Sequence, residues 1–157
     1  MSRLEPGQKA PEWTLKDSTG QQVSLSDFED RKVIIYFYPA AMTPGCTTQA
    51  NDFRDNYDVF TKKGYVVLGI SPDDTTKLAR FVEREEINFP VLSDPEKSVL
   101  VAYGAYGEKN LYGKTITGVI RSTVVIDGNG VVTLAKYNVR ATGHVASLAK
   151  QLNIELD

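Results

Sequence analysis

Cys46 is the only cysteine of the 157-residue chain, and its surroundings favour a reactive thiol. It follows an apolar and aromatic run, residues 33–38, that predicts a buried strand, and it lies in the first turn of a predicted helix, residues 43–61. The first backbone N–H groups of a helix have no partner within the helix, and the helix dipole is positive at that end. The sequence therefore predicts that Cys46 forms a thiolate, which is the nucleophilic state of cysteine.

Other chemistries that use one cysteine lack the residues that they require. A thioredoxin-type disulfide reductase needs a C-x-x-C pair, which a single cysteine excludes. A cysteine phosphatase needs an arginine six residues after the cysteine, where this chain has Asp52. A cysteine hydrolase needs a histidine base, and the only candidate is His144, which we expect on the surface near the start of a terminal helix. One cysteine and one histidine are too few for a usual zinc site, so we expect no metal.

The helix that carries the thiol has a clear start and two distinct faces. Thr43 suits the N-cap and Pro44 suits the first helical position. Apolar residues follow with spacings of four and three and define an inward face at positions 46, 50, 53, 57 and 60. Polar residues predict an outward face at positions 49, 52, 55 and 56.

The remaining elements predict one α/β domain over residues 1–157. A second buried strand over residues 65–70 completes a βαβ unit with the strand and helix before it. Further helices are expected over residues 75–86, 94–103 and 142–152, and hairpins over 11–25 and 122–137. Residues 104–118 show no clear period and are interpreted as a long loop. Parallel strands should form the middle of a mixed central sheet that is flanked by helices, with an antiparallel hairpin at one edge.

The composition excludes two classes of partner. The net charge is −2 and no basic run stands out, which argues against nucleic-acid binding. No segment offers the ~18 apolar residues that cross a membrane. The start of the chain lacks the apolar core of a signal peptide, and a single reduced thiol suits the cytoplasm.

The spacing Pro39-x-x-x-Thr43-x-x-Cys46 matches the active-site signature of the peroxiredoxins. Longer strings resemble the bacterioferritin comigratory, or Q-type, branch of that family: Phe37-Tyr38-Pro39, Thr43-Pro44-Gly45-Cys46-Thr47 and Phe53-Arg54-Asp55. Further matches occur in the same order at residues 69–71, 90–94, 121–123 and 143–145. This resemblance covers nearly the whole chain. It implies a thioredoxin-like fold and the reduction of hydrogen peroxide and organic hydroperoxides by a cysteine, without metal or flavin.

The resemblance also implies an active site and a role for each of its members. Cys46 would attack the peroxide and become a sulfenic acid. Arg121 would supply a permanent positive charge, and the Thr43 hydroxyl would donate to the peroxide or accept from it. Pro39 would shape the loop and shield the sulfur, and Gly45 would allow the substrate to approach the backbone closely.

The chain departs from the branch where a second, resolving cysteine is expected. Many members carry it five residues after the first, where this chain has Asn51, and residues 77–87 contain none either. Because the chain has a single cysteine, an intramolecular disulfide is impossible. Asparagine is a poor residue inside a helix, and Asn51 has no evident packing role there.

Three interpretations of the missing cysteine stay open. An external thiol could reduce Cys46: thioredoxin, another redoxin, or a thiol of the mycothiol or glutathione type. Cys46 could instead pair with a partner protein or a second copy, although the resemblance favours a monomer. Asn51 could also be an engineered replacement that blocks resolution. The alternative to an enzyme is a non-catalytic or redox-sensing thioredoxin-fold module that binds a partner.

Overall fold

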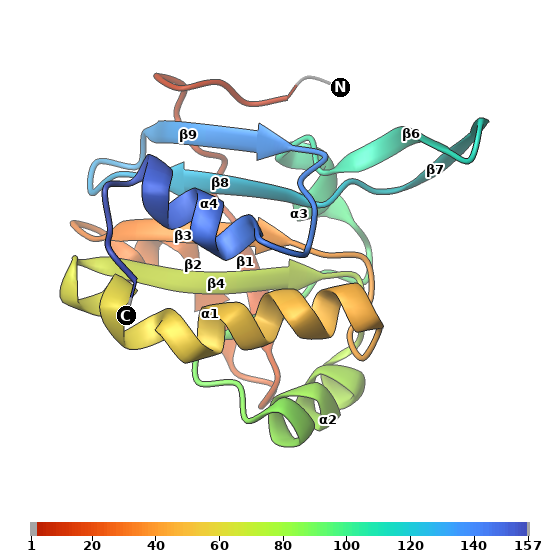
Figure 1. The fold of residues 1–157 in the computed structure, drawn as a ribbon, viewed down its shortest axis with the longest axis horizontal. Coiled ribbons are helices and arrows are strands. Elements are labelled where there is room, and N and C mark those ends of the chain that lie inside the picture. Colours follow the sequence, from red (N-terminus) through yellow and green to blue (C-terminus); the bar gives the residue numbers. More distant parts are fainter. Residues whose placement is uncertain (1–2, 157) are drawn as a thin grey trace.

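A seven-stranded mixed sheet forms the centre of the computed structural model, which describes residues 3–156 (Figure 1). Its strands are β1 (Thr14–Asp17), β2 (Gln22–Ser24), β3 (Lys32–Phe37), β4 (Tyr65–Ser71), β5 (Val91–Ser93), β8 (Ser122–Ile126) and β9 (Val132–Tyr137). They lie in the order β2-β1-β5-β4-β3-β8-β9. The neighbours β3, β4 and β5 are parallel, and the other pairings are antiparallel. The predicted mixed sheet with parallel strands in its middle is confirmed, with β5 as a third parallel strand.

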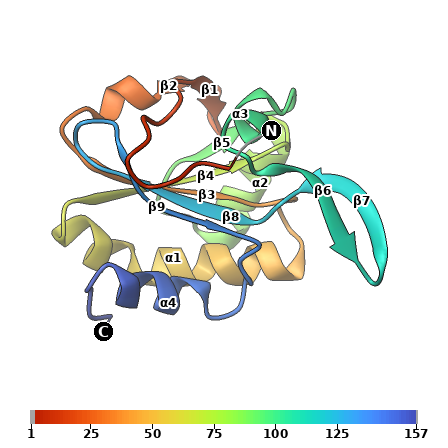
Figure 2. The same ribbon diagram turned by 90° about the horizontal axis from the view of Figure 1, so that it is seen from above.

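Helices cover the two faces of this sheet. They are the 3-10 helix η1 (Leu25–Phe28) and the α-helices α1 (Pro44–Lys62), α2 (Thr75–Glu85), α3 (Ser98–Ala102) and α4 (His144–Gln151). Figure 2 shows α1 and α4 side by side on one face, and the two helices are in contact. Residues of α1, α2 and α4 share one apolar core, and residues of α3 and η1 share the other.

Strand β3 contributes to both cores, which explains why its sequence is apolar throughout. Ile34, Tyr36 and the following Tyr38 point into the core beneath α1. Val33, Ile35 and Phe37 point into the core on the opposite face. Side chains of a strand alternate between the two faces of the sheet, so a strand that is covered on both sides has no polar face. The strand therefore ends at the base of α1 in a rigid, buried position.

The expected loop over residues 104–118 is wrong. This segment forms a hairpin of β6 (Tyr106–Leu111) and β7 (Lys114–Val119), which stands away from the body of the molecule (Figure 2). Tyr112 and Gly113 make its turn with positive φ values of 52° and 79°. Residues 114–117 of β7 are exposed, so this part of the hairpin has no buried side that would impose an alternation of apolar and polar residues on its sequence.

Other element boundaries agree closely with the sequence. Helix α1 has Thr43 at its N-cap and Pro44 at its first position, as predicted. The helix expected from residue 94 is shorter and begins at Ser98, because Lys97 has a left-handed conformation with a φ of 64°, which a right-handed helix cannot include. Within residues 3–156, no helix combines the length and apolar character that crossing a bilayer requires.

We expect Gly69→Ala to destabilise the fold, because Gly69 of β4 makes room for the ring of Tyr36 on β3. A Cβ at position 69 would lie 3.0 Å from Cζ of that ring. Overpacking of this kind costs about 1–3 kcal/mol in the free energy of unfolding, which urea denaturation measures. The matched control is Gly107→Ala in β6, where no heavy atom lies within 4 Å of the added Cβ. Equal losses in the two variants would contradict the packing argument.

Candidate active site

The structure places Cys46 just past the carboxyl end of β3, in the first turn of α1. Its side chain is 1% exposed and belongs to the core beneath α1, so the predicted inward face is confirmed. It is a free thiol. A sulfur at this position lies at the positive end of the helix dipole. Burial keeps bulk water from the sulfur, so nearby protein groups must stabilise any charge that it carries.

Arg121 is the positively charged partner of Cys46. It lies immediately before β8, and its Nη2 donates to Sγ of Cys46 over 3.3 Å. The two residues are 75 positions apart in the chain, and the pairing of β8 with β3 brings them together. Among residues 3–156, the three ion pairs of the molecule do not include Arg121. Its positive charge is therefore available to a thiolate.

Gln49 also belongs to this site, and its predicted place on the outward face of the helix is wrong. It is fully buried, and its Oε1 accepts from Nη1 of Arg121 over 2.6 Å. Gln49 follows Cys46 by three positions, so the two side chains lie on one side of α1. The spacing of three from Cys46 is the signal that could have placed Gln49 in the site, but Arg121 reaches this side of the helix only in the folded chain. The Nε2 of Gln49 is buried without a hydrogen-bond partner.

The Thr43 hydroxyl turns back to the loop before the helix instead of capping it. Its Oγ1 donates to the carbonyl of Ala40 over 2.8 Å, and no side-chain hydrogen bond caps α1. Since a hydroxyl has one hydrogen and two lone pairs, this bond leaves the exposed Thr43 oxygen as an acceptor. Of the two roles that the sequence left open, the geometry favours acceptance.

Gly45 and Pro39 lie on either side of Thr43. A Cβ on Gly45 would lie 3.3 Å from Nη2 of Arg121 and 3.5 Å from Cβ of Ala141. The absence of a side chain therefore leaves space for the guanidinium, a purpose that the sequence did not reveal. Pro39 is half-buried, two residues beyond the end of β3.

Asn51 has a packing role, contrary to the expectation from the sequence. Its Oδ1 accepts from Nη1 of Arg54 over 3.1 Å, and the same nitrogen donates to the carbonyl of Glu85 over 2.6 Å. Arg54 also forms an ion pair with the neighbouring Asp55. Asn51 thus supports the arginine that links α1 to the end of α2.

His144 is buried, so its predicted surface position is wrong. Its side chain is 7% exposed, and its Nε2 shares a hydrogen bond of 2.7 Å with Oγ1 of Thr123. Its ring also meets the ring of Phe53 edge-on, with centroids 6.5 Å apart. Burial, together with the charge of Arg121, lowers the pKa of His144 to about 4. His144 makes no hydrogen bond to Cys46, which leaves the cysteine-hydrolase alternative without a base.

Two buried tyrosines, Tyr36 and Tyr38, lie in the same apolar core as Cys46. Tyr36 stacks on Phe53 with ring centroids 4.6 Å apart, and on Tyr38 with centroids 5.3 Å apart. Both hydroxyls are buried without a hydrogen-bond partner. Burial raises the pKa of Tyr36 and of Tyr38 well above the usual tyrosine value, so both stay neutral.

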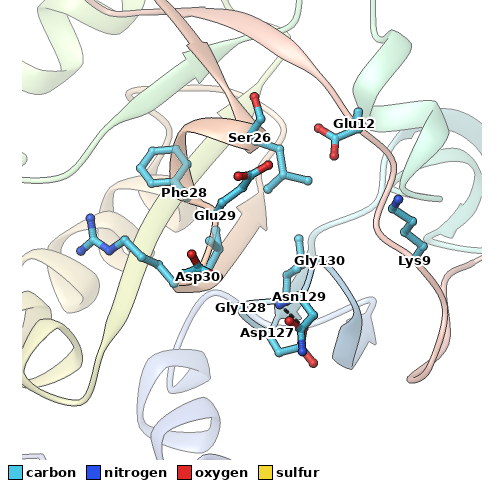
Figure 3. Close-up of a pocket in the computed structure, with 14 residues that line it drawn as sticks. Lys9, Glu12, Ser26, Phe28, Glu29, Asp30, Asp127, Gly128, Asn129 and Gly130 are labelled. Carbon is cyan, nitrogen blue, oxygen red and sulfur yellow. Dashed lines mark hydrogen bonds between the residues drawn. The ribbon is translucent and has the colours of Figure 1, made fainter.

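A polar cavity of about 210 Å³ lies at the other end of the sheet, near the start of β3 and the end of β8 (Figure 3). Its charged side chains carry both signs: Lys9, Glu12, Glu29, Asp30, Arg31 and Asp127. All six are exposed or half-buried, and the lining contains neither cysteine nor histidine. This cavity is separate from Cys46, which lies beyond the opposite end of β3.

Comparisons with known proteins match most of the chain. Residues 6–135 match the AhpC/TSA family. A Mycobacterium tuberculosis protein that is named as a peroxiredoxin is 58% identical over 153 residues, which cover 98% of both chains. Peroxiredoxin Bcp of Escherichia coli is 48% identical over 132 residues, which cover 84% of this chain and 85% of its own. The solved structure of peroxidoxin BcpB from M. tuberculosis is 33% identical with a TM-score of 0.84, covering 96% of this chain and 97% of the other.

The lowered pKa of the buried His144 predicts that the protein loses stability in mild acid. As the pH falls below 6.5, the unfolded chain binds a proton at His144, whereas the folded chain resists protonation until about pH 4. The free energy of unfolding should therefore fall by about 2–3 kcal/mol across this window. The measurement is urea denaturation at several pH values, with His144→Gln as the control that removes the only histidine. Identical pH dependence in the two proteins would contradict the assignment.

Proposed function

The chain belongs to the peroxiredoxins of the AhpC/TSA family, which are thiol peroxidases, and we propose that Cys46 is the residue that reacts with the peroxide. The observation that carries this proposal is the contact of 3.3 Å between Nη2 of Arg121 and Sγ of Cys46. A permanent cation beside a buried sulfur stabilises the thiolate. The helix start adds the same sign of charge.

The reaction that we propose is a displacement at oxygen. The thiolate attacks one oxygen of the peroxide, a sulfur–oxygen bond forms and the O–O bond breaks. The second oxygen leaves as hydroxide or alkoxide and takes up a proton, while Cys46 becomes a sulfenic acid. The sulfur loses the two electrons that the peroxide gains. Arg121 also stabilises the negative charge that develops on the peroxide oxygens in the transition state. Donors that are already in place before the reaction are the most effective at this stabilisation.

Thr43 orients the substrate in this proposal. Its hydroxyl hydrogen is engaged by the carbonyl of Ala40, so its oxygen accepts a hydrogen bond from the O–H of the peroxide. This contact aligns the O–O bond with the sulfur, and alignment of reacting atoms lowers the barrier. Gly45 keeps the space for Arg121, and Pro39 shapes the loop that shields the sulfur.

The sulfenic acid is returned to the thiol by an external reductant, because the chain has no second cysteine. One external thiol condenses with the sulfenic acid to a mixed disulfide and water, and a second thiol then releases Cys46. We propose that thioredoxin, another redoxin, or a thiol of the glutathione or mycothiol type serves this step. We also propose that the protein acts as a monomer of one domain, residues 1–157, in the cytoplasm, where thiols are kept reduced.

We expect stoichiometric hydrogen peroxide to add one oxygen to the intact protein, and dimedone to trap the product at Cys46. Intact-mass measurement follows both, and Cys46→Ser is the control that must gain nothing. Arg121→Leu should slow the oxidation by about 10²–10³-fold, because it removes a donor and the positive charge. Arg121→Lys keeps the charge without the fork of the guanidinium, and its rate should lie in between. A parent protein that stays unmodified under these conditions would exclude Cys46 as the peroxidatic residue.

We expect Gln49→Leu to slow oxidation of Cys46 by about tenfold, because it leaves Nη1 of Arg121 without its acceptor. In an Arg121→Leu protein, which has no guanidinium for Gln49 to hold, the same substitution should change the rate by less than about threefold. Stopped-flow measurement of peroxide consumption under single-turnover conditions gives both rates. If Gln49→Leu slows the oxidation equally in the two backgrounds, Gln49 does not act by holding Arg121.

A further inference from the structure

Both polar atoms of the peptide group between Ala40 and Ala41 are engaged. The N–H of Ala41 donates to Oδ2 of Asp73 over 2.7 Å in a buried contact. The carbonyl of Ala40, at the other side of the same peptide plane, accepts from Oγ1 of Thr43 over 2.8 Å. Because a peptide group is rigid and planar, the position of the Asp73 carboxylate sets the direction of the Ala40 carbonyl. The direction of that carbonyl in turn sets the Thr43 hydroxyl.

Asp73 is itself held in place from several sides. Its carboxylate accepts from Oγ of Ser71 over 2.8 Å and pairs with Nζ of Lys77 over 3.1 Å. Its backbone carbonyl accepts from Oγ of Ser93 over 2.6 Å. The residue follows the carboxyl end of β4, the strand beside β3, and its side chain is 7% exposed. A buried carboxylate with this many partners is a fixed point next to the loop.

The loop between β3 and α1 needs such a fixed point. Met42 has a φ of 66°, a left-handed conformation that residues other than glycine disfavour. A disfavoured backbone conformation persists only where the surrounding structure determines it. Ala41, one residue earlier, is 1% exposed and bonded to Asp73, so the strained residue lies between this anchor and Thr43.

We propose that Asp73 is a positioning residue of the peroxidase reaction, which it serves through the peptide group 40–41 and the Thr43 hydroxyl. This inference rests on the proposed reaction of Cys46 with peroxide. The carboxylate holds the peptide plane and polarises it, which strengthens the bond that the Ala40 carbonyl accepts from Thr43. The hydroxyl hydrogen is thereby directed away from the substrate, and the Thr43 oxygen is left to accept from the O–H of the peroxide. Within residues 3–156, Asp73 makes no hydrogen bond or ion pair with Cys46 or Arg121, so it acts only through this relay.

Two reactions of Cys46 separate this role from a merely structural one. Reduction of hydrogen peroxide uses the Thr43 acceptor, whereas alkylation by iodoacetamide uses only the thiolate. Asp73→Ala should lower the rate of peroxide reduction by about 10–100-fold, since small misplacements of reacting groups have effects of this size. The rate of alkylation at the same pH should stay within about threefold of the parent rate. A parallel fall in both rates would overturn the proposal.

Two further variants serve as controls. Asp94→Ala removes another buried carboxylate, which accepts from the N–H of Leu100 at the start of α3 and does not bond to the 40–41 peptide. It should lower stability but leave the ratio of the peroxide rate to the alkylation rate unchanged. Asp73→Asn offers an amide oxygen to the N–H of Ala41 and should recover part of the lost rate. This variant also replaces Asp73→Ala if the alanine protein does not fold.

A double-mutant cycle tests the relay itself. If Asp73 acts through Thr43, adding Asp73→Ala, or Asp73→Asn in its place, to a Thr43→Val protein should change the peroxide rate by less than about threefold. Full additivity of the two substitutions would overturn the relay. A parent protein that does not react with peroxide at all would instead overturn the proposed function of Cys46, so the two failures are distinguishable.

Discussion

The contact between Arg121 and the buried sulfur of Cys46 is the interaction on which the rest of the site depends. In the proposed reaction a thiolate at this buried position needs a compensating charge. The guanidinium of Arg121 lies in contact with the sulfur, and among residues 3–156 it forms no ion pair with a carboxylate. Gly45 leaves room for the guanidinium, and Gln49 fixes its second nitrogen. Together, Gly45 and Gln49 hold the positive charge of Arg121 against a sulfur that lies at the positive end of a helix.

The parallel strands β3 and β4 position the two loops that lie beside this contact. Strand β3 delivers the chain to the start of α1, and the aromatic stack of Tyr36 and Phe53 fixes the helix against the sheet. Strand β4 ends beside it and delivers Asp73 to the loop that carries Thr43. In the proposed reaction, the β3–α1 half of the βαβ unit therefore presents Cys46, and Asp73 after β4 holds the loop that carries Thr43.

Local signals were sufficient for the elements with a buried face. The apolar run of β3 and the regular spacing in α1 predicted both elements to within a residue or two, since burial imposes a period on the sequence. The hairpin of β6 and β7 was missed because it buries little on either face, so no such period arises. The prediction that His144 lies on the surface was wrong for a related reason. Its burial depends on Phe53 and Thr123, which come from elements far away in the chain.

The sequence by itself determined the single candidate for the nucleophile, its place at a helix start, the absence of a second cysteine and, through the resemblance of its motifs, the family. These follow from residue identity and short spacings, which the unfolded chain already contains. Only the tertiary structure decided that Gln49 faces Arg121, that Thr43 turns to the carbonyl of Ala40, and that Asp73 holds the same peptide group. Two of these contacts join residues 32 and 72 positions apart, and Thr43 takes its direction from the first of them. No local pattern encodes such pairings, because they arise only when the strands of the sheet come together.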